Sequence, residues 1–147
     1  MISGDNSLII IKATPDDIDE IKRIADAHRR ELGFVRRPSL LEAIDRSEVL
    51  IAKQNGSILG FVEYRHRKDE QTTLHNIAIV STYQRKGIGR KLVERLVSEA
   101  QEMGKSHISL KCPVDLPANE FYKMLNFQLC GIEPGKRRNL KIWRWWI

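Results

Sequence analysis

The feature that most constrains the fold is a turn between an apolar strand and a long amphipathic helix, within residues 74–103. The apolar run before the turn is typical of a strand buried on both faces. Beyond the turn, apolar residues recur at helical spacing as far as Met103. Two glycines and three cations occupy the turn, in the sequence Gln84-Arg85-Lys86-Gly87-Ile88-Gly89-Arg90. The first turn of a helix presents unpaired N–H groups and partial positive charge, so this pattern predicts an anion site, most simply for phosphate.

A simpler interpretation remains open, in which the glycines only permit a tight turn and the cations are solvated. Two nucleotide-binding loops are excluded. The chain has no Gly-x-x-x-x-Gly-Lys-Ser/Thr sequence, and Leu92 stands where Gly-x-Gly-x-x-Gly requires its third glycine.

Length and composition indicate one globular domain, residues 1–147, with 41% hydrophobic and 30% charged residues. The chain has neither an apolar run of membrane-spanning length nor a signal-peptide pattern, so we expect a cytoplasmic protein that does not enter membranes. Cys112 and Cys130 lack metal-ligand or redox spacing, which predicts free, mostly buried thiols and no metal. The net charge of +6 suits an anionic ligand, either a phosphorylated cofactor or nucleic acid.

Periodicity and turn signals predict seven strands and four helices. The strands are expected at 9–13, 48–53, 57–64, 72–80, 107–111, 127–131 and 140–147, and the helices at 14–32, 39–44, 88–103 and 118–125. Asn55-Gly56 predicts a hairpin, and Gly104 the end of the long helix. Thr14 and the pair Ser39 and Glu42 are expected to cap helix starts, and Asn126 to end a helix in the left-handed conformation. The order βααβββαβαββ is that of a mixed α/β (α+β) fold.

Two segments resemble motifs of the GNAT superfamily of N-acetyltransferases. The first is Asn76-Ile77-Ala78-Ile79 followed by Gln84-Arg85-Lys86-Gly87-Ile88-Gly89, and the second is Ala118-Asn119-Glu120-Phe121-Tyr122-Lys123-Met124-Leu125-Asn126-Phe127. One helix and one strand separate them, as in the family, and the element order fits nearly the whole chain. The resemblance implies a mostly antiparallel central sheet with helices on both faces.

The resemblance also implies acetyl-CoA as cosubstrate, with its pyrophosphate on the glycine turn and its pantetheine arm beside the preceding strand. Asp115 stands where the family often has Asn near the cofactor arm, and we expect this carboxylate to cap the following helix. The residues expected to bind the cofactor are Ile77, Ala78, Ile79, Gln84, Arg85, Lys86, Gly87, Ile88, Gly89, Arg90, Asp115, Ala118 and Phe121.

Acetyl transfer to an amine requires a group that removes a proton and a group that protonates the leaving thiolate. By resemblance Tyr122 is the acid. His75, on the central strand, is the first candidate for the base, and Glu63 on the preceding strand is the alternative. A water molecule or another residue also remains open. His28, His66 and His107 are expected to be structural or surface residues.

The activity expected from the resemblance is transfer of an acetyl group from acetyl-CoA to a primary amine, by direct attack in a ternary complex. The acceptor, a small molecule or a protein amine, is expected to contact the region from Leu32 to Arg46 and the last turn, Glu133 to Asn139. Two other classes remain: a catalytically silent CoA-binding module, and a nucleic-acid binder suggested by the basic, tryptophan-rich C-terminal segment. Either a monomer or a homodimer fits the sequence.

Overall fold

A computed structural model describes residues 7–147. The first six residues of the predicted domain 1–147 lie outside this described range. The chain forms two compact units. The first contains the chain up to Tyr64 together with His75–Leu96, and the second contains Arg65–Leu74 and Val97–Ile147. The strands of residues 7–147 form one sheet in the order β1-β2-β3-β4-β5-β7-β6. Strand β4 (Gln71–Ile79) contributes to both units.

The first three strands of the first unit are antiparallel neighbours. Strand β1 (Ile9–Lys12) pairs with β2 (Val49–Gln54), and β2 pairs with β3 (Ser57–His66). Asn55 and Gly56 connect β2 to β3 with φ angles of 52° and 79°, which confirms the hairpin predicted from this dipeptide. A register shift at Ala52/Lys53 places a β-bulge in the same hairpin.

The predicted helix at 14–32 is divided into three pieces: η1 (Pro15–Asp17), α1 (Ile18–Ala27) and α2 (Arg29–Leu32). Thr14 begins η1 as expected, and its backbone N–H donates to Oδ2 of Asp17 at 2.8 Å. The capping box predicted at Ser39 is wrong. Helix α3 (Arg37–Asp45) begins two residues earlier, after the N-cap Arg36, because a proline is compatible with the first turn of a helix.

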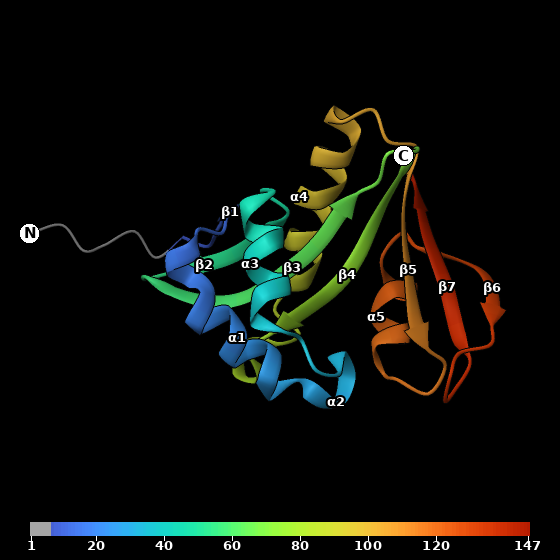
Figure 1. Cartoon of the computed structure of the whole chain (residues 1–147), viewed down its shortest axis with the longest axis horizontal. Helices are drawn as coiled ribbons and strands as arrows, with labels where there is room; N and C mark the ends of the chain where they lie inside the picture. Colours follow the sequence, from blue (N-terminus) through green and yellow to red (C-terminus); the bar gives the residue numbers. More distant parts are fainter. Residues whose placement is uncertain (1–6) are drawn as a thin grey trace, which may run out of the picture. The chain divides into compact units, whose positions relative to one another are not determined.

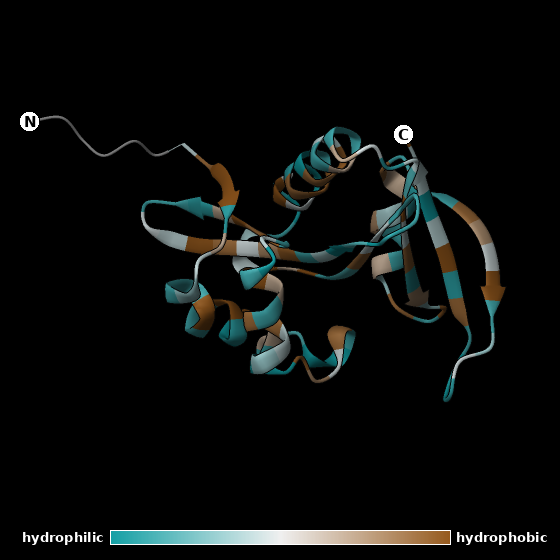
Figure 2. Cartoon of the chain, turned by 45° about the horizontal axis from the view of Figure 1, so that its top comes forward, coloured by the Kyte–Doolittle hydropathy of each residue, from teal (hydrophilic) through white to brown (hydrophobic). Residues whose placement is uncertain are grey.

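Helices cover both faces of the first unit's strands, as the resemblance implied. Helices α1 and α3 lie on one side, and the N-terminal part of α4 (Ile88–Glu102) lies on the other (Figures 1 and 2). The core beneath α1 and α3 is made of buried apolar side chains from these helices, from β2, β3 and β4, and from two connecting segments. Its members are Ala13, Ile21, Ile24, Ala25, Val35, Leu40, Ala43, Ile44, Val49, Ile51, Ile58, Phe61 and Ala78.

Helix α4 has the predicted amphipathic pattern, with Leu92, Leu96 and Ala100 fully buried and the opposite side polar. In Figure 2 the ribbon of this helix alternates between hydrophilic and hydrophobic residues. Gly104 follows the helix with a φ of 75°, which confirms the predicted end. Met103 was expected in the apolar stripe, but it is 57% exposed because the helix ends before it.

The second unit contains β5 (His107–Pro113), α5 (Ala118–Met124), β6 (Gln128–Glu133) and β7 (Leu140–Trp146). Strand β7 lies between β5 and β6 and is antiparallel to both. The start of β4 pairs with β5 in parallel, through Gln71–Thr73 and residues 107–109. The sheet is therefore mostly antiparallel, as expected.

Two local predictions in the second unit are wrong. Strand β5 continues through Cys112 and Pro113, beyond the predicted end at residue 111, because these residues pair with β7. Asn126 does not adopt positive φ, since α5 ends through an extended Leu125 with φ −83° and ψ −154°. Within residues 7–147, none of the helices has the length and apolar character needed to cross a membrane.

Candidate active site

The glycine turn before α4 has the backbone that the sequence predicted. Arg85 and Gly87 have φ angles of 64° and 83°, and a short helix that was not predicted, η2 (Ser81–Tyr83), connects β4 to the turn. A Cβ at Gly87 would meet no atom within 4 Å, so the glycine is needed for its backbone angle and not for space. The amide of Lys91 donates to the Gly87 carbonyl at 3.1 Å. The amides of Ile88 and Gly89 thus precede the first intrahelical hydrogen bond, as in helix N-termini that bind anions.

The side chains of Arg85, Lys86 and Arg90 are exposed around this turn, which makes the N-terminus of α4 strongly cationic. The Nζ atom of Lys86 also lies 5.6 Å from the centre of the Tyr83 ring, within the range of a cation–π contact. Charge and backbone therefore both favour a phosphate ligand at this position.

Gln84 connects the turn to α1 through a contact that the sequence did not reveal. Its side-chain amide donates to the Ile79 carbonyl at 3.2 Å and lies 3.2 Å from Nε2 of His28. Nδ1 of His28 lies 2.9 Å from the Ile24 carbonyl, which can only accept, so Nδ1 carries the proton and Nε2 accepts from Gln84. His28 is partly buried, as expected, and it fixes the first residue of the glycine motif.

The cofactor-binding strand segment predicted at Ile77, Ala78 and Ile79 is the last part of β4. Ala78 is buried, whereas Ile77 and Ile79 are half-buried. Gly60 of β3 allows a close approach to this segment, because a Cβ at residue 60 would lie 2.6 Å from Cδ1 of Ile79 and 2.9 Å from the Ala78 carbonyl oxygen.

A pocket of about 300 Å³ lies beside β3 and β4 in the first unit. Its walls come from the segment around α2 and α3 and from the two strands, and the lining residues are Leu32, Phe34, Val35, Arg36, Ser39, Glu63, His75 and Asn76. Both residues considered as the base therefore line one pocket. The acceptor region predicted at Leu32–Arg46 supplies the opposite wall.

Glu63 and His75 differ in their surroundings. Glu63 is only 8% exposed, and its Oε1 accepts a hydrogen bond of 2.8 Å from Nδ2 of Asn76. Burial raises the pKa of the Glu63 carboxyl, while the Asn76 hydrogen bond and the charge of Arg46 act in the opposite direction. His75 is exposed at the surface of the same pocket. The sequence assigned no role to Asn76. Its contact with Glu63 depends on the register between β3 and β4, which the sequence alone does not give.

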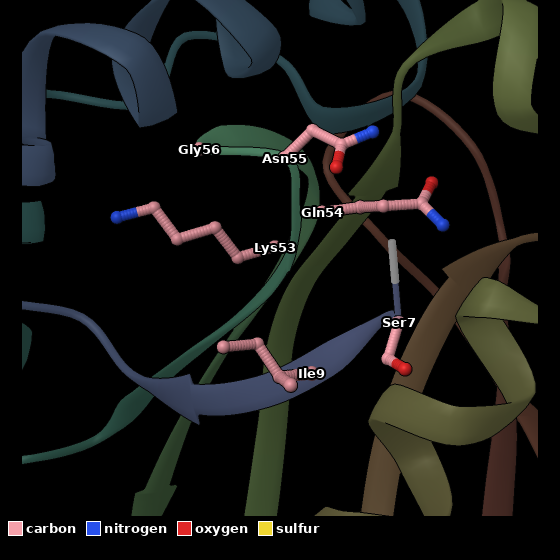
Figure 3. Close-up of a pocket in the computed structure, with 6 residues that line it drawn as sticks. All are labelled: Ser7, Ile9, Lys53, Gln54, Asn55 and Gly56. Atoms are coloured by element: carbon pink, nitrogen blue, oxygen red, sulfur yellow. The ribbon is translucent and has the colours of Figure 1, made fainter. Parts of the chain in front are cut away.

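A smaller hollow of about 190 Å³ lies at the β2–β3 hairpin (Figure 3), lined by Ser7, Ile9, Lys53, Gln54, Asn55 and Gly56. Lys53 and Gln54 point to opposite sides of β2 in this view, as successive strand residues do. Nζ of Lys53 lies 3.7 Å from Oδ1 of Asp17. This hollow contains none of the predicted site residues, so the pocket at Glu63 is the better candidate for chemistry.

Tyr122 lies on α5 in the second unit, only 6% exposed. Its ring makes edge contacts with Phe121 and Phe127, and Phe127 in turn packs edge-on against Trp145. Burial raises the pKa of the Tyr122 phenol, and the nearby Cys112 adds to the increase. Burial likewise raises the pKa of the Cys112 thiol, to about 11. Both groups therefore stay protonated at neutral pH.

The turn before α5 differs from its prediction. Asp115 does not cap the helix, whose N-cap is Pro117. Its carboxylate instead accepts two hydrogen bonds, of 3.1 and 3.0 Å, from Nη1 of Arg138. Asn119 orders the turn in its place, since its Nδ2 donates to the Pro113 and Leu116 carbonyls. Ala118 and Phe121 are half-buried at the start of the same helix.

The C-terminal tryptophans make contacts within the second unit. Trp143 is buried, and its Nε1 donates to Oδ1 of Asn119 at 2.9 Å. Trp146 is half-exposed and lies against the ring of His107, at 4.9 Å between ring centres. Burial of Trp143 removes one of the three tryptophans from the stacking surface that the nucleic-acid hypothesis would use.

Other sequence expectations have mixed outcomes. Both cysteines are free, with Cys112 buried as expected, but Cys130 is exposed on β6. His66 was expected at the surface, yet its ring contacts Oγ1 of Thr72 and Oε2 of Glu99 at 2.7 and 2.8 Å. The described part of the chain contains no group of three or more His, Cys, Asp or Glu residues arranged to hold a metal ion.

The fold defined by these elements is shared with solved acetyltransferase structures. Ard1 from Thermoplasma volcanium superimposes with a TM-score of 0.83 at 20% identity, over 93% of this chain and 95% of that one. The ribosomal-protein-S18-alanine N-acetyltransferase from Escherichia coli gives 0.76 at 22% identity, over 96% and 94%. The PaiA N-acetyltransferase from Thermoplasma acidophilum, solved in complex with coenzyme A, gives 0.81 at 18% identity, over 96% and 99%.

The family model of the Acetyltransferase (GNAT) family matches residues 18–127, so the chain belongs to this family. The [ribosomal protein bS18]-alanine N-acetyltransferase of Escherichia coli K12 is 36% identical over 87 residues, covering 58% of this chain and 55% of that protein. The L-amino acid N-acyltransferase MnaT of the same strain is 33% identical over 61 residues, covering 39% and 36%. The chain thus spans about a third to a half of the length of these curated relatives.

Proposed function

We propose that the protein transfers an acetyl group from acetyl-CoA to a primary amine. The observation that carries this proposal is the glycine turn of a GNAT-family chain, in which positive φ at Arg85 and Gly87 leads directly into the cationic N-terminus of α4. This turn suits the pyrophosphate of coenzyme A. The complexes of neighbouring structures with coenzyme A or acetyl-CoA support the same cosubstrate.

The residues proposed to hold acetyl-CoA divide by the part of the molecule that they contact. The turn from Gln84 to Arg90 holds the pyrophosphate, and the β4 segment Ile77–Ile79 takes the pantetheine arm, with a backbone N–H polarising the thioester carbonyl. Ala118 and Phe121 of α5 and the neighbouring Asp115 complete the cofactor-binding set. The pairing of Asp115 with Arg138 supports this assignment, because it partly neutralises a carboxylate that would repel phosphate.

We assign the base to Glu63, in preference to His75. A general base works best with a pKa near the working pH, and burial moves the Glu63 pKa toward that range. The hydrogen bond from Asn76 fixes the direction of the carboxylate at the pocket wall. His75 lines the same pocket but is exposed, so it is the second candidate.

Tyr122 is proposed as the acid, because burial keeps its phenol protonated at neutral pH and so leaves a proton available for the leaving thiolate. In the reaction, the neutral amine nitrogen forms a bond to the thioester carbonyl carbon. The carbon–sulfur bond breaks with its electron pair on sulfur. Glu63 takes a proton from the nitrogen, and the thiolate takes the phenol proton of Tyr122. Exchange with solvent then restores both side chains.

The test is an amine screen with acetyl-CoA, in which thiol release is followed and the acetylated product is identified by mass spectrometry. The proposal expects product with at least one primary amine. If no amine in a panel of amino acids, peptides, polyamines and aminoglycosides reacts, while coenzyme A still raises the melting temperature, the chain is a CoA-binding module and the enzymatic proposal is wrong.

A further inference from the structure

We infer that the pocket beside β3 and β4 selects a free α-amino acid with an apolar side chain, and that Arg36 is the residue that recognises its carboxylate. This inference rests on the proposed acetyl transfer and narrows its acceptor. It follows from the three kinds of group that line the pocket: a buried carboxyl, an arginine and an apolar wall.

Glu63 supplies the carboxyl that faces an amine. It is 8% exposed, and Asn76 occupies one of its oxygens, so the carboxylate has capacity to accept from an incoming N–H group. A carboxylate in this position favours an acceptor that is cationic in solution and releases a proton on reaction. It does not distinguish one amine from another.

Arg36 supplies the second recognition element. It is the N-cap residue of α3 and lines the same pocket as Glu63, with an extended backbone at φ −79° and ψ 137°. Ser39, in the first turn of α3, lines the pocket beside it, where the helix dipole adds partial positive charge. A guanidinium binds a carboxylate through paired hydrogen bonds, so this side of the pocket suits an anion next to the amine.

Two further cations contact Phe34, but neither lines the pocket, and Nζ of Lys22 is already paired with Oδ1 of Asp26. Phe34, which lines the pocket, has Nζ of Lys22 at 4.8 Å and the guanidinium carbon of Arg29 at 4.9 Å from its ring centre. Two cations thus hold the 66% exposed ring in place. Arg37 also does not line the pocket, and it donates to Oδ1 of Asp19 at 2.7 Å. Among the pocket-lining residues, Arg36 is therefore the cation available to a ligand.

The remaining wall is apolar. Val35 is buried, Leu32 is half-buried and Phe34 presents its exposed ring, so three apolar side chains line the pocket together with Arg36. An acceptor with an amine, an adjacent carboxylate and a branched or aromatic side chain would use all three surfaces. A peptide N-terminus lacks the adjacent carboxylate, and a lysine side chain carries its amine far from one.

The test compares L-leucine with 3-methylbutylamine, which is leucine without its carboxylate, and with the dipeptide Leu-Ala. We expect kcat/KM to be highest for L-leucine. In Arg36→Met the ratio of leucine to 3-methylbutylamine should fall by about ten- to a hundredfold, as for loss of a charge-assisted hydrogen bond. Arg37→Met is the matched control and should keep the ratio. Comparing one substrate pair across variants cancels the difference in amine basicity.

Two results would overturn the inference while leaving acetyl transfer intact: a wild-type preference for Leu-Ala or 3-methylbutylamine, or an equal loss on both substrates in Arg36→Met. If no amine yields product, calorimetric titration of the protein with L-leucine decides the matter separately. Binding of leucine that weakens in Arg36→Met and not in Arg37→Met would then support the carboxylate site, and absence of binding would reject it.

Discussion

At the scale of single residues, burial acts in the same direction on the two groups proposed for proton transfer, although their roles differ. Burial disfavours ionisation of both Tyr122 and Glu63 and raises both pKa values. For the phenol this preserves the proton that a thiolate needs. For the carboxyl it strengthens a base that would be too weak at its ordinary pKa.

Replacing Tyr122 by Phe should lower kcat by about a hundredfold or more, the usual range for loss of a general acid, while coenzyme A still stabilises the protein against heat. The comparison is Tyr64→Phe, which removes the buried hydroxyl that accepts a hydrogen bond from Lys12 at 2.7 Å. That variant should lose stability but keep its turnover. Equal turnover in Tyr122→Phe and wild type would remove Tyr122 from the mechanism.

Glu63→Gln should lower kcat/KM by about a hundredfold and abolish the acidic limb of its pH profile, because Glu63 must lose its proton to act. Wild-type activity should rise with pH through the raised pKa of this carboxyl. His75→Gln is the matched comparison. If His75→Gln removes the limb and Glu63→Gln does not, the histidine is the base.

The same carboxyl should also affect stability. Its pKa in the folded chain lies above the unfolded value, so the native state binds more protons between the two and the free energy of unfolding falls as pH rises through that window. Chemical denaturation at several pH values should therefore show Glu63→Gln gaining stability relative to wild type as the pH increases. A constant difference would contradict the raised pKa.

At the scale of elements, the decisive unit is the turn that begins α4. Gly87 and Gly104 stand at the two ends of this helix with φ angles of 83° and 75°, and neither has an atom within 4 Å of an added Cβ. They provide the same backbone geometry in different surroundings. Only Gly87 belongs to the proposed phosphate site, so the pair separates a backbone effect from a ligand effect.

Alanine at either glycine should cost about 1 kcal/mol of unfolding free energy, because each requires the left-handed conformation. Gly87→Ala should additionally raise the KM for acetyl-CoA several-fold, whereas Gly104→Ala should leave it unchanged. Steady-state kinetics alongside urea denaturation would measure both effects. Equal KM values in the two variants would argue against the turn as the pyrophosphate site.

The elements also indicate how far the sequence could predict the structure. The α4 stripe and the Asn55-Gly56 hairpin depend on local periodicity and turn chemistry, so their predictions were confirmed. The expectation that the strand before the glycine turn is buried on both faces was wrong, because β4 buries Thr72, Leu74 and Ala78 on one face and exposes His75 on the other. Asp115 and Asn126 were mispredicted because competing tertiary interactions decided their roles: Arg138 captured the carboxylate, and α5 ended through an extended Leu125. The contact of Asn76 with Glu63 joins two strands, and periodicity within one strand cannot supply the register between them.

At the scale of the whole molecule, net charge affects the rate at which a charged ligand binds. The chain carries a formal charge of +6, and the cations of the α4 turn lie at the surface. Coenzyme A is a polyanion, so its encounter with this protein should be accelerated by long-range attraction. Salt at physiological strength and above shortens the range of that attraction to roughly 8 Å or less.

Raising NaCl from 50 to 500 mM should therefore increase the KM for acetyl-CoA several-fold, with a smaller effect on kcat. S-acetyl-N-acetylcysteamine, a thioester without phosphates, is the control substrate, and its kcat/KM should change little. The same salt dependence for both thioesters would show that salt acts on the acceptor or on the protein fold, and not on phosphate binding.

The close approach at Gly60 also limits which sequences can encode this chain. A methyl group there would meet a flexible side-chain end at Ile79, which can move, and the carbonyl oxygen of Ala78, which belongs to the backbone and cannot yield without displacing β4. Residue 60 is therefore closed to all nineteen side chains, alanine included, although it takes no part in chemistry. A saturation library selected for folded protein should return glycine almost alone at this codon, while neighbouring positions of β3 vary among apolar residues. The close packing of β3 against the segment proposed to bind the thioester thus depends on glycine at residue 60.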